Sequence, residues 1–270
     1  MSSHDPSSRD DVKYHIGFAR RDLPEGTSIA LLSGDPGRSE LIAQQYLANG
    51  RELARNRGLD SFVAELPGGA PVVCATSGMG APSMSIVVNE LAAIGITTVI
   101  RIGTSGSIQD HVRVGEVVIA SGALTNQGAA LDIAPVEFPA AADPFLVVQL
   151  AQAAAAIGAA HHVGVMASVD TFFEGQERTA TSANPHLIRR LRGMIDEYHD
   201  LGVLNFEMEA GTLLKMGLVY GFAAGCVCAI VAQRTEDENP RLDLKDAAID
   251  NAIRVAIAGA DTRSLSATSG

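Results

Sequence analysis

The sequence predicts an α/β domain in which helices cover a mainly parallel or mixed β-sheet. Strand-like and helix-like segments alternate along the chain, which has 270 residues, 47% of them hydrophobic, enough to bury a large core. The chain shows no internal repeat, no linker rich in proline or serine and no break in composition. We therefore predict a single domain at 14–262, with a disordered arm at 1–13 and a flexible tail at 263–270.

Each predicted element follows from the spacing of its apolar residues and from the residues at its ends. Strands are predicted at 28–32, 61–66, 71–76, 99–102, 116–121, 162–168, 203–206 and 225–232. Helices are predicted at 38–47, 83–94, 145–157, 187–201, 210–220 and 242–260. The turn Pro67-Gly68-Gly69 should join two of the strands in a hairpin. Ser83 is expected to cap the second helix, and Gly95 and Gly158 to end the second and third.

Charge and cysteine content narrow the possible functions. The formal net charge of −11 speaks against sequence-independent binding of nucleic acid, which needs a basic surface. No apolar run reaches membrane-spanning length, and the first residues resemble no signal peptide. Cys74, Cys226 and Cys228 lie in apolar strand-like runs without the spacing of a disulfide framework or a zinc site. An odd number of cysteines in this pattern favours buried thiols in a reducing compartment, so we expect a cytoplasmic protein.

Two glycine-rich segments, each with an arginine, follow apolar runs. The first is Ser33-Gly34-Asp35-Pro36-Gly37-Arg38, and the second is Arg101-Ile102-Gly103-Thr104-Ser105-Gly106-Ser107. Glycines let the backbone approach an anion, N–H groups of a turn can line an anion site, and arginine adds a planar cationic fork. Two such turns in an acidic protein predict a site for one phosphate.

Four arginines occupy predicted loop or strand-end positions: Arg38, Arg57, Arg101 and Arg234. Each one alone is well explained as a solvated surface charge. Arg101 and Arg234 are different because each ends a strongly apolar run, where a charge must be paired or functional.

The segment from Asp170 to Arg178 follows a predicted strand and carries an aromatic pair. A flat heterocycle could stack on Phe172, while Gln176 and Arg178 bond to its edge, since a glutamine amide both donates and accepts as a lactam such as uracil requires. A polar loop with an aromatic plug explains the same residues, and for this segment alone that interpretation is favoured.

The segment Asn205-Phe206-Glu207-Met208-Glu209 places two carboxylates on one side of an extended stretch. Glu209 could accept hydrogen bonds from two sugar hydroxyls, with Met208 covering the apolar face of the sugar. The same residues fit a helix start, where Glu209 would favour the helix N-terminus, and the two interpretations are compatible. We find no GxGxxG after a strand, no Walker loop, no HExxH and no GxSxG, so neither a cofactor nor a metal is predicted.

In this order, the segments resemble the uridine phosphorylase branch of the nucleoside phosphorylase-I family, from about Tyr14 to the last helix. The resemblance rests on Gly34-Asp35-Pro36 with Arg38, Ile100–Thr104, Gly128–Leu131 to Ala134–Pro139, Thr171-Phe172 with Gly175–Arg178, and Asn205–Glu209. It implies a nucleoside phosphorylase-like, three-layer α/β/α sandwich around a twisted mixed β-sheet. It also implies a homo-oligomer, a hexamer built as a trimer of dimers, with each site at a dimer interface.

The resemblance further implies roles for individual residues. Phosphate, a co-substrate rather than a cofactor, would be bound by Gly34, Arg38, Arg101, Thr104 and a neighbouring subunit's Arg57. The base would be bound by Phe172, Gln176, Arg178 and Arg234, and the ribose by Thr104, Met208, Glu209 and a neighbour's His15. The implied catalytic residues are Arg38, Arg101, Gln176, Arg178 and Glu209. Gly58 stands where some bacterial members carry a glutamate that binds a monovalent cation, so that ion is not implied here.

The implied reaction is the reversible phosphorolysis of uridine, or a related pyrimidine nucleoside, to uracil and ribose 1-phosphate. A purine nucleoside phosphorylase on the same fold is the nearest alternative, but purine members usually carry an acidic residue after a serine where this chain has Ala232-Gln233-Arg234-Thr235. A nucleosidase that uses water would leave the phosphate arginines without a use. A non-catalytic nucleoside-binding protein would need the base and sugar contacts but not those arginines. Tolerance for thymidine or deoxyuridine depends on the pocket near Val231 and Ala232.

Overall fold

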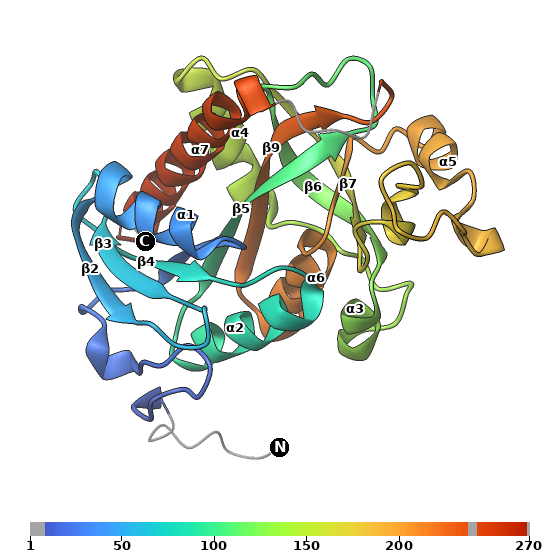
Figure 1. Cartoon of the computed structure of the whole chain (residues 1–270). Coiled ribbons are helices and arrows are strands. Elements are labelled where there is room, and N and C mark those ends of the chain that lie inside the picture. Colours follow the sequence, from blue (N-terminus) through green and yellow to red (C-terminus); the bar gives the residue numbers. More distant parts are fainter. Residues whose placement is uncertain (1–8, 237–241, 269–270) are drawn as a thin grey trace.

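A nine-stranded mixed sheet with helices on both faces forms the described part of the chain, residues 9–236 and 242–268 of a computed structural model (Figure 1). The strands are β1 Ile29–Ser33, β2 Ala48–Ala54, β3 Ser61–Glu65, β4 Pro71–Thr76, β5 Thr98–Ser107, β6 Val117–Asn126, β7 His161–Val169, β8 Asn205–Glu207 and β9 Ala223–Gln233. The α-helices are α1 Pro36–Leu41, α2 Ala81–Ala93, α3 Gly128–Ile133, α4 Pro144–Ala156, α5 Met194–Asp200, α6 Ala210–Tyr220 and α7 Leu242–Thr268.

The strands follow the order β2-β3-β4-β1-β5-β8-β7-β6-β9, with an additional pairing between β5 and β9. That pairing closes β5, β8, β7, β6 and β9 into a ring, from which β1 to β4 extend as an open sheet. β5 runs parallel to β1 and to β9, so the carboxyl ends of these three strands meet at one edge. In open α/β sheets, ligands bind outside this edge.

Alternate strand residues pack on opposite faces of the sheet, which produces three layers. On β1, for example, Ala30 and Leu32 contact the cluster that contains α2 and α6, whereas Ile29 and Leu31 contact the cluster that contains α4 and α7. Figure 1 shows α4 and α7 on one side of the sheet and α2 with α6 on the other. The predicted three-layer α/β/α sandwich around a mixed sheet is therefore confirmed.

Most predicted elements are present at nearly the predicted positions. The hairpin of β3 and β4 is antiparallel as expected, and α6 has the predicted bounds. Gly95 and Gly158 have positive φ just after α2 and α4, as helix-ending glycines do. Cys74, Cys226 and Cys228 are free and fully buried, as predicted.

Two predicted helix starts are wrong. α1 begins two residues before the predicted Arg38, because the Asp35 side chain accepts a hydrogen bond from the N–H of Gly37 (2.9 Å) and Pro36 fits the first turn. Ser83 does not cap α2, which already begins at Ala81. Its hydroxyl donates instead to the carbonyl of Ser77, at 2.7 Å.

The predicted helix 187–201 is broken. A 3₁₀ turn at Arg189–Leu191 is separated from α5 by Gly193, whose φ of +76° is incompatible with a continuous α-helix. The apolar spacing was nevertheless informative, since Leu191 and Tyr198 are buried in one cluster with Phe206.

The segment 101–107, predicted as a glycine-rich turn after a strand, is instead part of β5. Its glycines make room for arginine side chains rather than for a turn. A Cβ on Gly103 would overlap with Nη1 of Arg101, and one on Gly106 would lie 2.9 Å from Cγ of Arg234. Arg101 consequently lies inside a strand rather than at its end.

The remaining differences concern elements that local pattern does not predict. β2 lacks apolar alternation because it is an exposed edge strand, and its position comes from its pairing with β3. α7 continues to Thr268, into the predicted tail. Residues 1–8 of the predicted arm lie outside the described residues. No helix within the described ranges combines the length and apolar character needed to cross a membrane.

Candidate active site

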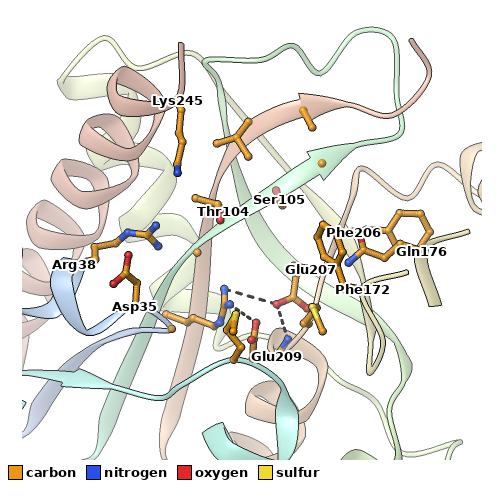
Figure 2. A pocket seen from close by; sticks show the side chains of 18 of the residues that line it. Asp35, Arg38, Thr104, Ser105, Phe172, Gln176, Phe206, Glu207, Glu209 and Lys245 are labelled. Atoms are coloured by element: carbon orange, nitrogen blue, oxygen red, sulfur yellow. Dashed lines mark hydrogen bonds and ion pairs between the residues drawn. The ribbon is translucent and has the colours of Figure 1, made fainter. Parts of the chain in front are cut away.

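A cavity of about 540 Å³ opens beside the carboxyl ends of β1, β5 and β9. Nine of the twelve predicted site residues line it: Gly34, Arg38, Arg101, Thr104, Phe172, Gln176, Arg178, Met208 and Glu209. Figure 2 shows Arg38 with Asp35 at one end, Phe172 with Gln176 at the other, and Glu209 between them. Segments far apart in the sequence are thus brought into one cavity.

Arg38 projects from α1 into the end of the cavity that we call the phosphate end, defined by Gly34, Asp35, Arg38, Arg101 and Thr104. Its Nη1 lies 3.4 Å from the carbonyl oxygen of Ile102 on β5. Burial lowers the pKa of Arg38, the nearby Arg101 lowers it further, and Asp35 opposes this shift. The lack of a side chain at Gly34 lets the backbone there pass close to Gly78, since a Cβ on Gly34 would lie 3.2 Å from the carbonyl oxygen of Gly78.

Arg101 is 5% exposed and is held by two carboxylates. Its Nη2 is bonded to Glu209, and its Nη1 lies 3.7 Å from Oε2 of Glu207. Burial alone would lower the pKa of Arg101, but Glu209 and Glu207 raise it well above its ordinary value. Nε of Arg101 has no hydrogen-bond partner in the described part of the chain. The guanidinium is therefore permanently charged and desolvated, and it still has an N–H group without a hydrogen-bond partner.

Glu207 was not assigned a role from sequence, yet it organises this region. Its Oε2 accepts from the N–H groups of Glu209 and Ala210, both at 2.8 Å, and its Oε1 is bonded to the hydroxyl of Ser168. Glu209 occupies the N-cap position of α6, but Glu207 satisfies the free N–H groups of that helix start. Burial raises the pKa of Glu207, and Arg101 opposes this rise.

The helix-start interpretation of this segment is thus correct, with Glu207 rather than Glu209 as the capping side chain. Glu209 stays available to the cavity, and its Oε1 accepts from the N–H of Gly80 at 2.6 Å. Met208 lines the cavity beside it, held by a 2.6 Å bond from Nε2 of Gln127 to its carbonyl.

The opposite end, the base end, is built by Phe172, Gln176 and Arg178 on the loop after β7. Gln176 and Arg178 are only 3% and 5% exposed, and Nε of Arg178 donates to Oε1 of Gln176 at 3.2 Å. The Arg178 guanidinium lies 4.2 Å from the centre of the Phe172 ring, within the range of a cation–π contact. Phe172 itself is 43% exposed, so part of its side chain is accessible to a ligand or to solvent.

Arg234 does not line the cavity but supports the base end from outside it. Its Nη2 donates to the carbonyl oxygen of Gln176 at 3.0 Å, which ties the end of β9 to the base-end loop. Of the residues to which the sequence assigned no role, Glu207 had the clearest signal, a second carboxylate two residues from Glu209. Lys245 on α7 also lines the cavity, and nothing in its local sequence indicates this.

His15 and Arg57 lie away from this cavity and beside each other. Nδ2 of Asn56 donates to the carbonyl oxygens of Tyr14 (2.7 Å) and His15 (2.9 Å), and the exposed Arg57 lies over the Tyr14 ring. Nδ1 of His15 is 2.6 Å from Glu90. One chain alone therefore does not bring these two residues to its own cavity.

Within the described ranges, no group of three or more His, Cys, Asp or Glu side chains could hold a metal ion. The comparisons with known proteins identify the family. Residues 28–261 match the model of the phosphorylase superfamily.

Among relatives, uridine phosphorylase from Salmonella typhimurium is 42% identical over 253 residues, which cover 94% of this chain and 98% of that protein. Uridine phosphorylase from Escherichia coli is 41% identical with the same coverage. Guanosine phosphorylase from Halorubrum lacusprofundi is 32% identical over 237 residues, 85% of this chain and 91% of that protein. Since the family model covers most of the chain and the match extends over nearly the full length of these relatives, the chain belongs to the phosphorylase superfamily.

Proposed function

We propose that this protein catalyses the reversible phosphorolysis of uridine to uracil and ribose 1-phosphate. One observation carries the proposal: a single cavity has arginines at one end, a buried Gln–Arg pair beside an open aromatic ring at the other, and a carboxylate between them. The nearly full-length similarity to proteins named uridine phosphorylase supports it.

At the phosphate end, Arg38 and Arg101 bind the phosphate dianion, with Thr104 and the backbone at Gly34 close to it. Arg101 is suited to this role because it is already desolvated and its Nε has no bond in the described part of the chain. Charge-assisted hydrogen bonds are stronger where water is excluded. Phosphate is a co-substrate, and the proposed reaction uses no cofactor, since phosphate itself supplies the nucleophile.

The ribose lies between the two ends, against Met208 and Glu209. A carboxylate has about four lone-pair positions, so Glu209 can accept from sugar hydroxyls while it remains bonded to Arg101 and Gly80. This arrangement fixes the anomeric carbon between the phosphate and the base, and positioning of this kind accounts for a large part of a displacement barrier.

At the base end, Gln176 and Arg178 bind the uracil edge, and Phe172 stacks against the ring. In the described part of the chain Nε of Arg178 donates to Oε1 of Gln176, and substrate binding exchanges this buried hydrogen bond for bonds to the base. During reaction the C–N bond electrons move to uracil while a phosphate oxygen bonds to the anomeric carbon. Arg178 and Gln176 donate to the uracil oxygens, where negative charge develops.

The proposal includes a homo-oligomer, a hexamer arranged as a trimer of dimers in which a neighbour completes each site. Support comes from His15 and Arg57, which share one surface region, outside their own chain's cavity. In a two-fold dimer, that region on one subunit can face the cavity of the other. Arg57 would then contact phosphate, and His15 the ribose 5′-hydroxyl.

We place this activity in the cytoplasm, a proposal that the three buried free thiols support. The purine alternative has one observation in its favour, the similarity to a guanosine phosphorylase. Against it, the end of β9 carries Arg234, bonded to the Gln176 loop, rather than an acidic residue.

The test is a substrate panel with and without inorganic phosphate, with nucleoside loss followed by absorbance. We expect rapid, phosphate-dependent cleavage of uridine, with ribose 1-phosphate as a product and little cleavage of inosine, guanosine or cytidine. Equal rates in phosphate-free buffer would identify a nucleosidase. Preference for guanosine or inosine would favour the purine alternative, and nucleoside binding without turnover would indicate a binding protein.

A further inference from the structure

The first turns of α7 carry a lysine over the phosphate end of the cavity. Lys245 is half-buried and lines the cavity together with Arg38 and Thr104. Figure 2 shows its side chain extending from α7 toward Arg38 and the space in front of Thr104. Among the residues that the structure describes, no carboxylate forms an ion pair with Lys245. A cation near a helix N-terminus is unfavourable for the helix dipole, so helix stability does not explain this lysine.

The charges at the phosphate end explain what this lysine could contribute. Arg38 and Arg101 at that end, counted with the carboxylate of Asp35 there and with Glu207 and Glu209 beside Arg101, leave one formal negative charge. A phosphate group carries about −1.5 to −2 at neutral pH, so an end with this balance would repel it. Lys245 makes the end formally neutral before any neighbouring subunit contributes, and its ammonium offers three hydrogen-bond donors.

We propose that Lys245 is a phosphate-binding residue that faces Arg38 across the bound anion. Arg38 contacts the phosphate from α1 and Lys245 from α7, so the two helices hold the anion from two directions. The lysine's flexible stem lets its charge follow the phosphate from the incoming ion to the sugar 1-phosphate product. This inference rests on the proposed function, because it assigns the anion as the phosphate of that reaction.

The experiment compares Lys245→Met and Lys245→Arg with the wild type. Calorimetry gives the dissociation constant for inorganic phosphate without nucleoside, and kinetics give the KM values for phosphate and for uridine. Arg254→Met is the matched control, since Arg254 lies on the same helix, is exposed and is bonded to Asp250 at 2.8 Å. Melting curves establish that each variant is folded.

Lys245→Met should bind phosphate about tenfold more weakly, the scale of one lost charge-assisted hydrogen bond in a half-exposed position. Its KM for phosphate should rise in parallel, the KM for uridine should change little, and Lys245→Arg should restore most of the affinity. A general structural defect would raise both KM values and would not be rescued by arginine.

Phosphate affinity of Lys245→Met equal to that of wild type and Arg254→Met would overturn the assignment. The results distinguish a failure of the proposed uridine reaction from a failure of the proposed role of Lys245. A wild type that binds phosphate in a Lys245-dependent manner but does not cleave uridine would refute the uridine reaction and support the lysine site. If the wild type cleaves uridine and Lys245→Met cleaves it with the same kinetics, the uridine reaction is supported and the lysine site is refuted.

Discussion

Removing the charge of Arg101 should destabilise the folded protein as well as impair phosphate binding. Arg101→Met introduces no new polar atom but leaves Glu207 and Glu209, 2% and 3% exposed, without the guanidinium that they share. Breaking a buried ion pair from one side costs about 3–5 kcal/mol, because the remaining charge stays desolvated. In a chain of this size, that loss lowers the melting temperature by roughly 6–20 °C.

The loss should depend on pH through Glu207. Burial raises the pKa of this carboxyl in the folded protein, and Arg101 is the strongest influence that lowers it. Without Arg101, the folded-state pKa rises further above the unfolded value of about 4.3. A carboxyl with a raised folded-state pKa takes up protons on folding, so stability falls as pH increases from the unfolded toward the folded pKa. The deficit of Arg101→Met should therefore be largest at neutral and alkaline pH and smaller in mild acid.

The chain has no tryptophan, so thermal and urea unfolding are best followed by far-ultraviolet circular dichroism. One protein concentration is used throughout, because the proposed oligomer would make the melting temperature depend on concentration. Adding Glu209→Gln to Arg101→Met should recover part of the stability, since one buried charge is removed. Arg55→Met is the control, because Arg55 pairs with Glu40, Glu52 and Asp60 at the surface and should change stability little. A deficit as small as that of Arg55→Met, or one that is independent of pH, would refute the reasoning.

Three further predictions concern the site itself. Gln176→Ala should slow uridine cleavage and reduce the preference for uridine over cytidine. In the wild type, cytosine leaves buried polar groups without partners, at a cost of roughly 1–3 kcal/mol each, and the variant removes part of that cost. An unchanged ratio of kcat/KM for uridine to kcat/KM for cytidine would argue against Gln176 as a base-binding residue. Gly103→Ala should raise the phosphate KM, because its Cβ would displace the Arg101 guanidinium, whereas Gly128→Ala, whose Cβ would lie 3.6 Å from Asp170, is the control. Mixing inactive His15→Ala subunits with inactive Arg38→Met subunits should restore activity at about a quarter of the sites, if two-fold dimers share them. No recovery after demonstrated subunit exchange would mean that each chain builds its own site.

Much of the fold could be predicted from sequence because its signals are local. The continuous apolar runs before Gly34 and around Val227 reflect burial on both faces of a strand, which any neighbour of the right shape provides. Elements without such a signal could not be predicted. β2 is polar and exists because β3 pairs with it, and the break at Gly193 depends on one backbone angle that composition does not reveal.

For the candidate site, the sequence alone determined which chemistry is present: guanidinium groups beside glycines, a Gln–Arg pair after an aromatic residue, and two carboxylates in one short segment. Only the tertiary structure decided how these groups are coupled. Arg101 forms ion pairs with Glu207 and Glu209, which lie more than a hundred residues away in the sequence. Lys245 lines the cavity at the phosphate end, although no motif in its local sequence indicates this. The physical reason is range: residue type and backbone preference act between near neighbours, whereas desolvation and ion pairing depend on which distant segments the packed sheet brings together.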